Sequence, residues 1–177
     1  LYHLTDQANV PRIRRFRTLE SAASLLYRAN LQQMTTVRRG DHLPILVEGE
    51  RLLLRDQAPL HEANISFSDG WSFTEFVDCL NRHVFFRSGS HQRPLDYGVR
   101  HFERYKLEGP LVLRIPFTSL LDVNSSVQPL FCKYNSGSPR FSGGLASPRG
   151  ARTFVTADDS TFLPGDVKEV VFQNSVA

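Results

Sequence analysis

The sequence lacks several features that would place it quickly in a protein class. Its two cysteines are too few for a disulfide framework and do not form a Cys-x-x-Cys pair, and its six histidines are scattered. This spacing predicts no zinc site and no other metal. No apolar run approaches the roughly 20 residues that span a bilayer. We therefore expect a cytoplasmic protein with no signal peptide and no membrane contact, in which Cys79 is a buried free thiol.

The common catalytic and nucleotide-binding motifs are also missing. The glycines match neither G-x-G-x-x-G nor a P-loop, and G-x-S-x-G and His-Glu-x-x-His do not occur. The sequence has no internal repeat and no change in composition that marks a second domain. With 177 residues, 41% of them apolar and 22% charged, residues 1–177 are predicted to form a single globular domain.

Positive charge is concentrated in the first third of the chain. Residues 1–60 hold 9 Lys and Arg against 6 Asp and Glu, whereas residues 61–177 hold 12 of each kind. Two groups of arginines stand out within this third, one at positions 12, 14, 15 and 17 and one at positions 38 and 39. The candidate nucleic-acid contacts among them are Arg12, Arg14, Arg15, Arg38 and Arg39. Arginines in such groups can contact nucleic-acid phosphates. A solvated helix face is an equally weighted interpretation of the same pattern.

Two short apolar segments near the chain ends carry the candidate chemistry. Residues 2–5 are predicted to form a strand that places His3 and Thr5 on one face, because side chains alternate along a strand. Residues 167–172 are predicted to form a second strand, which carries Glu169. If these two strands lie side by side, a histidine, a threonine and a glutamate line one cleft that can bind a dinucleotide.

The remaining pattern predicts an α+β fold, in which two small, mostly antiparallel sheets form a split β core flanked by helices. Helices are predicted after an Asp6 or Asn9 cap, over 18–29, after the capping box of Ser72 and Glu75, and over 95–105. Strands are predicted at 43–47, 52–54, 83–87, 111–115 and 153–156. The strand at 83–87 is expected to be central, with Arg87 at its end and a polar turn at 88–91.

Residues 134–150 are predicted to form a long loop rich in Gly, Ser and Pro. Long loops in compact domains are usually functional or disordered. Backbone N–H groups near Gly137 and the guanidinium of Arg149 are candidates to cradle a pyrophosphate. Asn135 and Ser136 belong to the same candidate site.

The segment Tyr2-His3-x-Thr5, followed by Asn9-Val10-Pro11-x-Ile13, resembles the opening of the DarT-type ADP-ribosyltransferases. The strand from Glu169 to Phe172 is similar to the one that carries their catalytic glutamate. The body of the chain resembles an uncharacterised bacterial family that shares this frame. The segments that carry this second resemblance are 56–60, 80–86, 135–138 and 149–154.

The first resemblance implies an ADP-ribosyltransferase-like domain that uses NAD as co-substrate, without a metal. It implies transfer of ADP-ribose to a base of DNA or RNA in a toxin or defence setting, with an antitoxin or immunity protein as partner. The implied catalytic residues are Glu169, His3 and Arg87, and the implied NAD contacts are Tyr2, His3, Thr5, Asn9, Asn135, Ser136 and Arg149.

Other functions are compatible with the same frame. A protein acceptor is one alternative. Another is a catalytically silent nucleic-acid-binding or immunity module. A third is an RNA 2′-phosphotransferase, which uses NAD on a related fold and surrounds its phosphate with several arginines and histidines; the sequence alone does not assign such a set.

Overall fold

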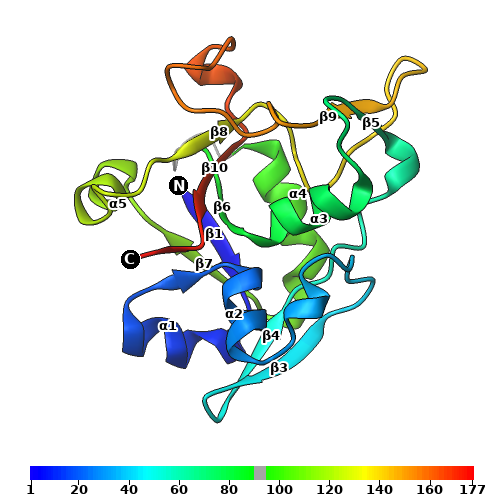
Figure 1. Cartoon of the computed structure of the whole chain (residues 1–177). Helices are drawn as coiled ribbons and strands as arrows, with labels where there is room; N and C mark the ends of the chain where they lie inside the picture. Colours follow the sequence, from blue (N-terminus) through cyan, green and yellow to red (C-terminus); the bar gives the residue numbers. More distant parts are fainter. Residues whose placement is uncertain (90–94) are drawn as a thin grey trace.

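Five strands form an antiparallel sheet at the centre of the molecule (Figure 1). The structure is a computed structural model that describes residues 1–89 and 95–177. The strands follow the order β7 (Leu111–Arg114), β1 (Tyr2–Thr5), β6 (His83–Arg87), β10 (Glu169–Gln173) and β8 (Leu130–Cys132). The predicted α+β class, with an antiparallel core and a central strand at 83–87, is confirmed.

The register of the sheet corrects two details of the prediction. β6 lies between β1 and β10, so the two strands with the candidate chemistry are not direct neighbours. The sheet is also one body rather than two separate ones. Its halves meet at a single register pair, Tyr2 with Arg87, whereas β6 and β10 share five pairs, from Glu169 with Arg87 to Gln173 with His83.

Five α-helices lie around the sheet in the described part of the chain: α1 (Val10–Phe16), α2 (Ala22–Arg28), α3 (Phe73–Asn81), α4 (Asp96–Tyr105) and α5 (Phe117–Val123). α3 and α4 lie on one side of the sheet and α5 on the other (Figure 1). The capping box that begins α3 is confirmed, since Ser72 and Glu75 each accept a hydrogen bond from the other's backbone N–H.

α2 begins four residues later than residue 18, where its predicted helix began. Residues Leu19–Glu20 instead form β2, which pairs with β11 (Ser175–Val176), and Ser21 caps the helix that follows. Leu19 lies in the apolar cluster against the sheet. The apolar stripe of this segment therefore spans a strand and a helix, which a single helical period does not resolve.

Two further strand pairs complete the fold. The predicted hairpin is confirmed as β3 (Leu43–Val47) and β4 (Glu50–Leu54). The parallel pair of β5 (Ile65–Phe67) and β9 (Ser147–Arg149) was not predicted. The predicted strand at 153–156 is wrong, because Val155 makes only an isolated bridge with Phe131.

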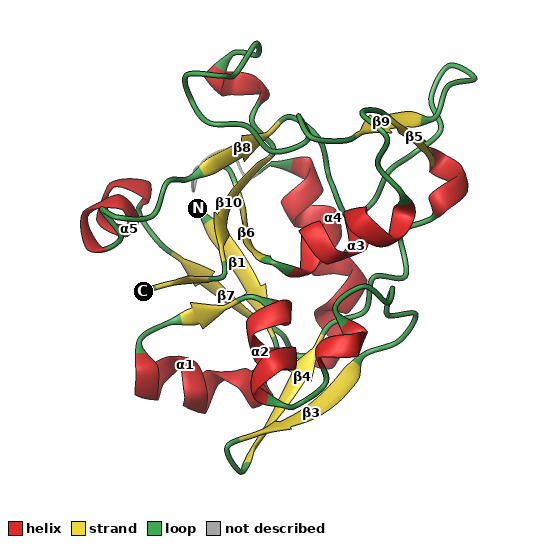
Figure 2. Cartoon of the chain, viewed as in Figure 1, coloured by secondary structure: helices red, strands yellow, loops and turns green. Residues whose placement is uncertain are grey.

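The segments between β8 and β10 are mostly loop (Figure 2). Short 3₁₀ helices in the described residues are η1 (Gln7–Asn9), η2 (Gln32–Met34), η3 (Glu62–Asn64), η4 (Lys106–Glu108) and η5 (Pro164–Asp166). Residues 90 and 91 of the polar turn predicted at 88–91 lie outside the described residues. Among the described helices, none combines the length and apolar character that a membrane crossing requires.

The sheet buries a different apolar cluster on each face. Val84, Phe86 and Phe172 pack with Leu19 and Leu120 on one face. Phe85 on the opposite face of β6 packs with the cluster of α3. This alternation along β6 is the predicted one, and it leaves the two ends of the strand to carry His83 and Arg87.

Candidate functional site

A cavity of about 350 Å³ opens beside the junction of β1 and β6. Its walls come from β1, the hairpin strand β4, helix α4 and the loop that follows β8. This volume lies within the range of small-molecule sites. Eight of the nine predicted catalytic and NAD-binding residues line the cavity, namely Tyr2, His3, Thr5, Asn9, Arg87, Asn135, Ser136 and Glu169.

Glu169 and Arg87 form a buried ion pair in one wall of the cavity. They are register partners on β10 and β6, so their side chains leave the sheet on the same face. Arg87 Nη1 donates to Glu169 Oε1, and the backbone N–H of Ser136 donates to Glu169 Oε2 at 3.2 Å. Arg87 Nη2 donates to Asn135 Oδ1 at 2.7 Å. The loop after β8 thus closes over a carboxylate that is only 1% exposed.

Ser136 offers an unused hydrogen-bonding group in this wall. Its hydroxyl is fully buried and has no hydrogen-bond partner among the described residues. An unsatisfied buried hydroxyl costs about 1–3 kcal/mol. Because Ser136 lines the cavity next to Glu169, a ligand with a polar group at this point would remove that cost.

His3 lines the same cavity as a neutral ring. Its Nδ1 lies 2.9 Å from the Phe85 carbonyl oxygen, which only accepts hydrogen bonds, so we assign the ring proton to Nδ1. Burial lowers the pKa of His3, with a smaller contribution in the same direction from Arg55. Nε2 therefore keeps an acceptor lone pair for a ligand.

Asn9 has a structural role in the cavity wall. Its amide bonds the backbone N–H of Leu53 at 2.9 Å and the Leu53 carbonyl at 3.0 Å, as a neighbouring strand would. It also donates to the Thr5 hydroxyl at 3.3 Å. The predicted NAD contact through Asn9 is thus replaced by bonds that fix the β3–β4 hairpin to the N-terminal segment.

Arg149 is the one predicted NAD-binding residue that does not line the cavity. Its guanidinium stacks 4.4 Å from the ring centroid of Tyr134 and donates to the Asn135 carbonyl at 3.3 Å. Burial lowers its pKa. Arg149 therefore supports the loop from behind, and the predicted pyrophosphate cradle does not include it.

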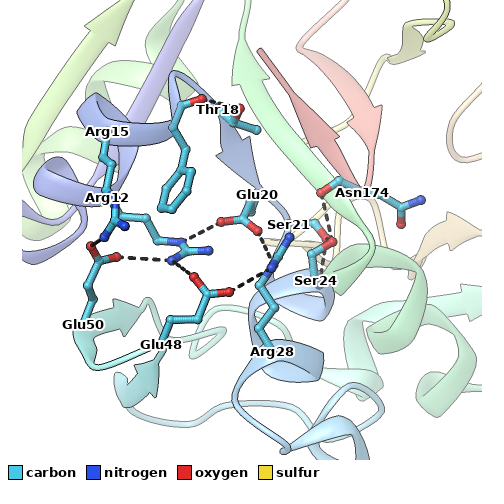
Figure 3. A network of polar contacts seen from close by, with 11 residues as sticks. Arg12, Arg15, Thr18, Glu20, Ser21, Ser24, Arg28, Glu48, Glu50 and Asn174 are labelled. Carbon is cyan, nitrogen blue, oxygen red and sulfur yellow. Dashed lines mark hydrogen bonds and ion pairs between the residues drawn. The ribbon is translucent and has the colours of Figure 1, made fainter.

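Arg12, a predicted nucleic-acid contact, is buried and bonded within the protein, whereas Arg15 is exposed. The Arg12 side chain is 6% exposed and bonds Glu20 at 2.7 Å and Glu48 and Glu50 at 3.2 Å each (Figure 3). Arg15 also pairs with Glu50. The arginine spacing in the sequence therefore reflects a salt-bridge cluster, defined here by Arg12 and its three glutamates, that joins α1 to β2 and the hairpin.

Arg38 and Arg39, which were also predicted to contact nucleic acid, are bonded to groups within the protein. Arg39 is buried and donates to Asn81 Oδ1 at 2.8 Å and to the Arg55 carbonyl at 3.0 Å. Arg38 donates to two backbone carbonyls, at residues 57 and 58. Of the five predicted arginines, Arg14 alone is exposed without an ion pair among the described residues.

The sequence interpretation missed the cavity wall supplied by α4. Tyr97, Arg100, His101 and Arg104 line the cavity from one face of this helix. Gly98 of this helix packs close to β6, since a Cβ there would be 3.6 Å from Arg87 Cβ. Polar and aromatic residues recur at helical spacing at positions 97, 101, 104 and 105, and this pattern could have indicated the cavity wall. No apolar stripe showed which face of the helix points toward the protein.

His101 makes the stability of the protein depend on pH. Burial, together with Arg87 and Arg55, lowers the pKa of His101 to about 3. The unfolded chain takes up a proton at this residue as the pH falls through about 6.5, and the folded protein does not, so stability falls with pH. Between pH 7 and pH 5, His101 is expected to lower the free energy of unfolding by about 2 kcal/mol. His101→Gln should lack this part of the decrease.

Urea unfolding of both proteins at the two pH values measures this difference. His61→Gln is the matched control, because His61 is exposed and outside the cavity. An equal pH dependence in wild type and His101→Gln would contradict the prediction.

The two cysteines contribute no nucleophile at neutral pH. Both are free thiols. Burial raises the pKa of Cys79 to about 11, and burial with the nearby Glu169 carboxylate raises the pKa of Cys132 to about 12. Neither cysteine lines the cavity, so the chemistry of the cavity rests on other side chains.

Comparison with known proteins gives a family without an assigned activity. No curated protein and no solved structure matches the chain. A family model described as "Family of unknown function (DUF7002)" matches residues 1–177. Because the match extends over the whole chain, the protein belongs to the DUF7002 family.

Proposed function

We propose that the protein is an NAD-dependent ADP-ribosyltransferase that modifies a nucleic-acid base. The observation that carries the proposal is the buried Glu169, bonded by Arg87 and Ser136, in one cavity with the neutral His3. The near division of the sheet at Tyr2 and Arg87 supports an ADP-ribosyltransferase-like split core.

The reaction breaks the bond between the nicotinamide nitrogen and the ribose C1′. The electron pair of this bond goes to nicotinamide, which leaves as a neutral molecule, so the step needs no strong acid. A transition state with positive charge at C1′ is stabilised by a nearby carboxylate. The acceptor then forms a bond to C1′, and the Glu169 carboxylate takes up the proton that the acceptor loses.

Each remaining group has a role that its contacts support. Arg87 and the Ser136 N–H orient the carboxylate of Glu169. The free Ser136 hydroxyl and His3 Nε2 are left to bond ribose hydroxyls or the nicotinamide amide. The NAD contacts predicted at Tyr2 and Thr5 remain part of the proposal because both residues line the cavity.

The lining also favours a second candidate, the RNA 2′-phosphotransferase. That reaction needs several arginines and histidines around one phosphate. The cavity is lined by His3 and His101 and by arginines that include Arg87, Arg100 and Arg104. In this candidate, the same NAD site would accept a phosphate from RNA rather than modify a base.

The deciding experiment incubates the full chain with NAD and measures nicotinamide release. Separate reactions contain single-stranded DNA, RNA, RNA with an internal 2′-phosphate, or a protein extract. Label from the ADP-ribose portion of NAD in DNA or RNA would support the first proposal, and NAD-dependent loss of the 2′-phosphate would support the second. The absence of nicotinamide release with every acceptor would overturn both proposals, whether or not NAD binds.

A further inference from the structure

Three exposed arginines in the lining of the cavity have no hydrogen-bond or ion-pair partner among the described residues. Arg100 and Arg104 lie on α4, and Arg140 lies in the loop after β8. All three are exposed and line the cavity, and none makes a hydrogen bond or ion pair within residues 1–89 and 95–177. The other cavity arginines, by contrast, are bonded to protein groups: Arg12, Arg39, Arg55 and Arg87.

Within the described residues, neither acid of α4, Asp96 or Glu103, forms an ion pair with Arg100 or Arg104. Arg100 and Arg104 are four residues apart, so they share one helix face, where like charges oppose helix formation. The acid nearest to them in sequence, Glu103, pairs with Lys106 instead. A repulsive pair of this kind, retained on a cavity wall, is relieved when an anion binds between the two side chains.

The four acids that line the cavity have other partners among the described residues. Asp6 lies 3.9 Å from Arg55, and Glu20 pairs with Arg12 and Arg28. Glu169 is held by Arg87, and Asp56 accepts the Tyr105 hydroxyl at 3.0 Å and lies 3.0 Å from His42 Nδ1. His101, beside Arg100, carries no positive charge near neutral pH. The free positive charge in the described lining is thus concentrated on α4 and the loop after β8.

We propose that Arg100, Arg104 and Arg140 form a subsite for the phosphate groups of the ligand. Guanidinium groups bind phosphate oxygens through paired, charge-assisted hydrogen bonds. The phosphates belong either to the pyrophosphate of the dinucleotide or to the phosphodiester backbone of a nucleic-acid acceptor. The inference rests on the proposed function for the identity of the ligand, and it moves phosphate recognition away from Arg149 and the N-terminal arginines.

The experiment measures binding rather than turnover. ADP-ribose, a short single-stranded RNA and a short single-stranded DNA are titrated separately into the full chain and into three variants, Arg100→Gln, Arg104→Gln and Arg140→Gln. Arg51→Gln is the matched control, because Arg51 is an exposed arginine outside the cavity. Loss of one charge-assisted contact is expected to weaken binding about tenfold.

The choice of probe separates the two phosphate sources. Weaker binding of ADP-ribose alone assigns the subsite to the pyrophosphate. Weaker binding of the oligonucleotides, with a smaller salt dependence, assigns it to the acceptor backbone. Wild-type affinity for all probes in the three variants, or no binding of any probe to the wild type, overturns the subsite.

Failure of the subsite and failure of the proposed function are distinguishable. If the variants lose phosphate binding but the wild type releases no nicotinamide, the subsite stands and the transferase proposal fails. If the wild type transfers ADP-ribose and the three variants bind every probe normally, the transferase proposal stands and the subsite fails.

Discussion

Glu169→Gln is expected to lower the rate of NAD-dependent transfer by about a hundredfold to ten-thousandfold. The amide cannot take a proton from the acceptor and carries no charge to stabilise the developing cation. It also places an N–H₂ group against one of two donors, Arg87 Nη1 or the Ser136 N–H. The rate of nicotinamide release, measured with saturating NAD and acceptor, tests this expectation.

Stability must be measured beside this rate, because the substitution leaves the Arg87 guanidinium without its carboxylate. Breaking a buried pair costs about 3 kcal/mol or more, so chemical unfolding has to show that Glu169→Gln is folded at the assay temperature. Glu169→Asp keeps the charge but shortens the side chain by one methylene, and it should also lose activity. Wild-type turnover in folded Glu169→Gln would remove Glu169 from the mechanism.

Arg12→Met is expected to lower the free energy of unfolding by about 3–5 kcal/mol. Arg12 is the shared partner of three carboxylates, which come from β2, from the hairpin turn and from the first residue of β4 (Figure 3). Methionine fills much of the same space but removes the one buried cation of the cluster. Glu50 is then left with the exposed Arg15, and the largely buried Glu20 shares the half-exposed Arg28 with Glu48. Urea unfolding of the two proteins at pH 7 measures the difference.

Arg15→Ala is the matched control for this prediction. Arg15 pairs with the same Glu50, but its side chain is 67% exposed, and exposed pairs contribute about 0–1 kcal/mol. A second check uses pH. Hydrogen bonds from Arg12 lower the pKa of Glu48 below its usual 4.5, so the benefit of Arg12 is lost as the pH falls below about 4.5. A difference between Arg12→Met and wild type that stayed constant to pH 3 would contradict the proposed cause.

Local signals in the sequence were sufficient where one physical rule determines the structure. The Ser72 capping box fixed the start of α3, and alternation along 83–87 identified the central strand and the position of Arg87. The pattern at the two chain ends predicted that His3, Thr5 and Glu169 share one cleft. All three line the cavity, although β6 separates their strands.

Long-range partners were beyond such rules. A group of arginines has the same sequence whether water, a phosphate or three glutamates surround it. The sequence therefore predicted a nucleic-acid contact or a solvated helix face with equal weight, and neither alternative includes the salt-bridge cluster of Arg12. The same reason explains the difference at Arg149, which was predicted to bind a pyrophosphate. No residue near Arg149 in the sequence indicates that Tyr134 covers its guanidinium. The α4 wall was missed because its face is defined by the cavity rather than by an apolar core.

The single pair that joins β1 to β6 divides the cavity walls between two mechanical units. One unit is formed by β1 and β7; it carries His3 and Thr5 and is bonded to the hairpin through Asn9. The other unit is formed by β6, β10 and β8, and it carries Arg87 and Glu169. Parting the units breaks far fewer ladder bonds than separating β6 from β10. Besides that one pair, the His3 hydrogen bond to the Phe85 carbonyl and the apolar cluster of Phe86 cross the seam. A ligand that touches both walls would act as a bridge across this seam and fasten the two halves of the sheet together.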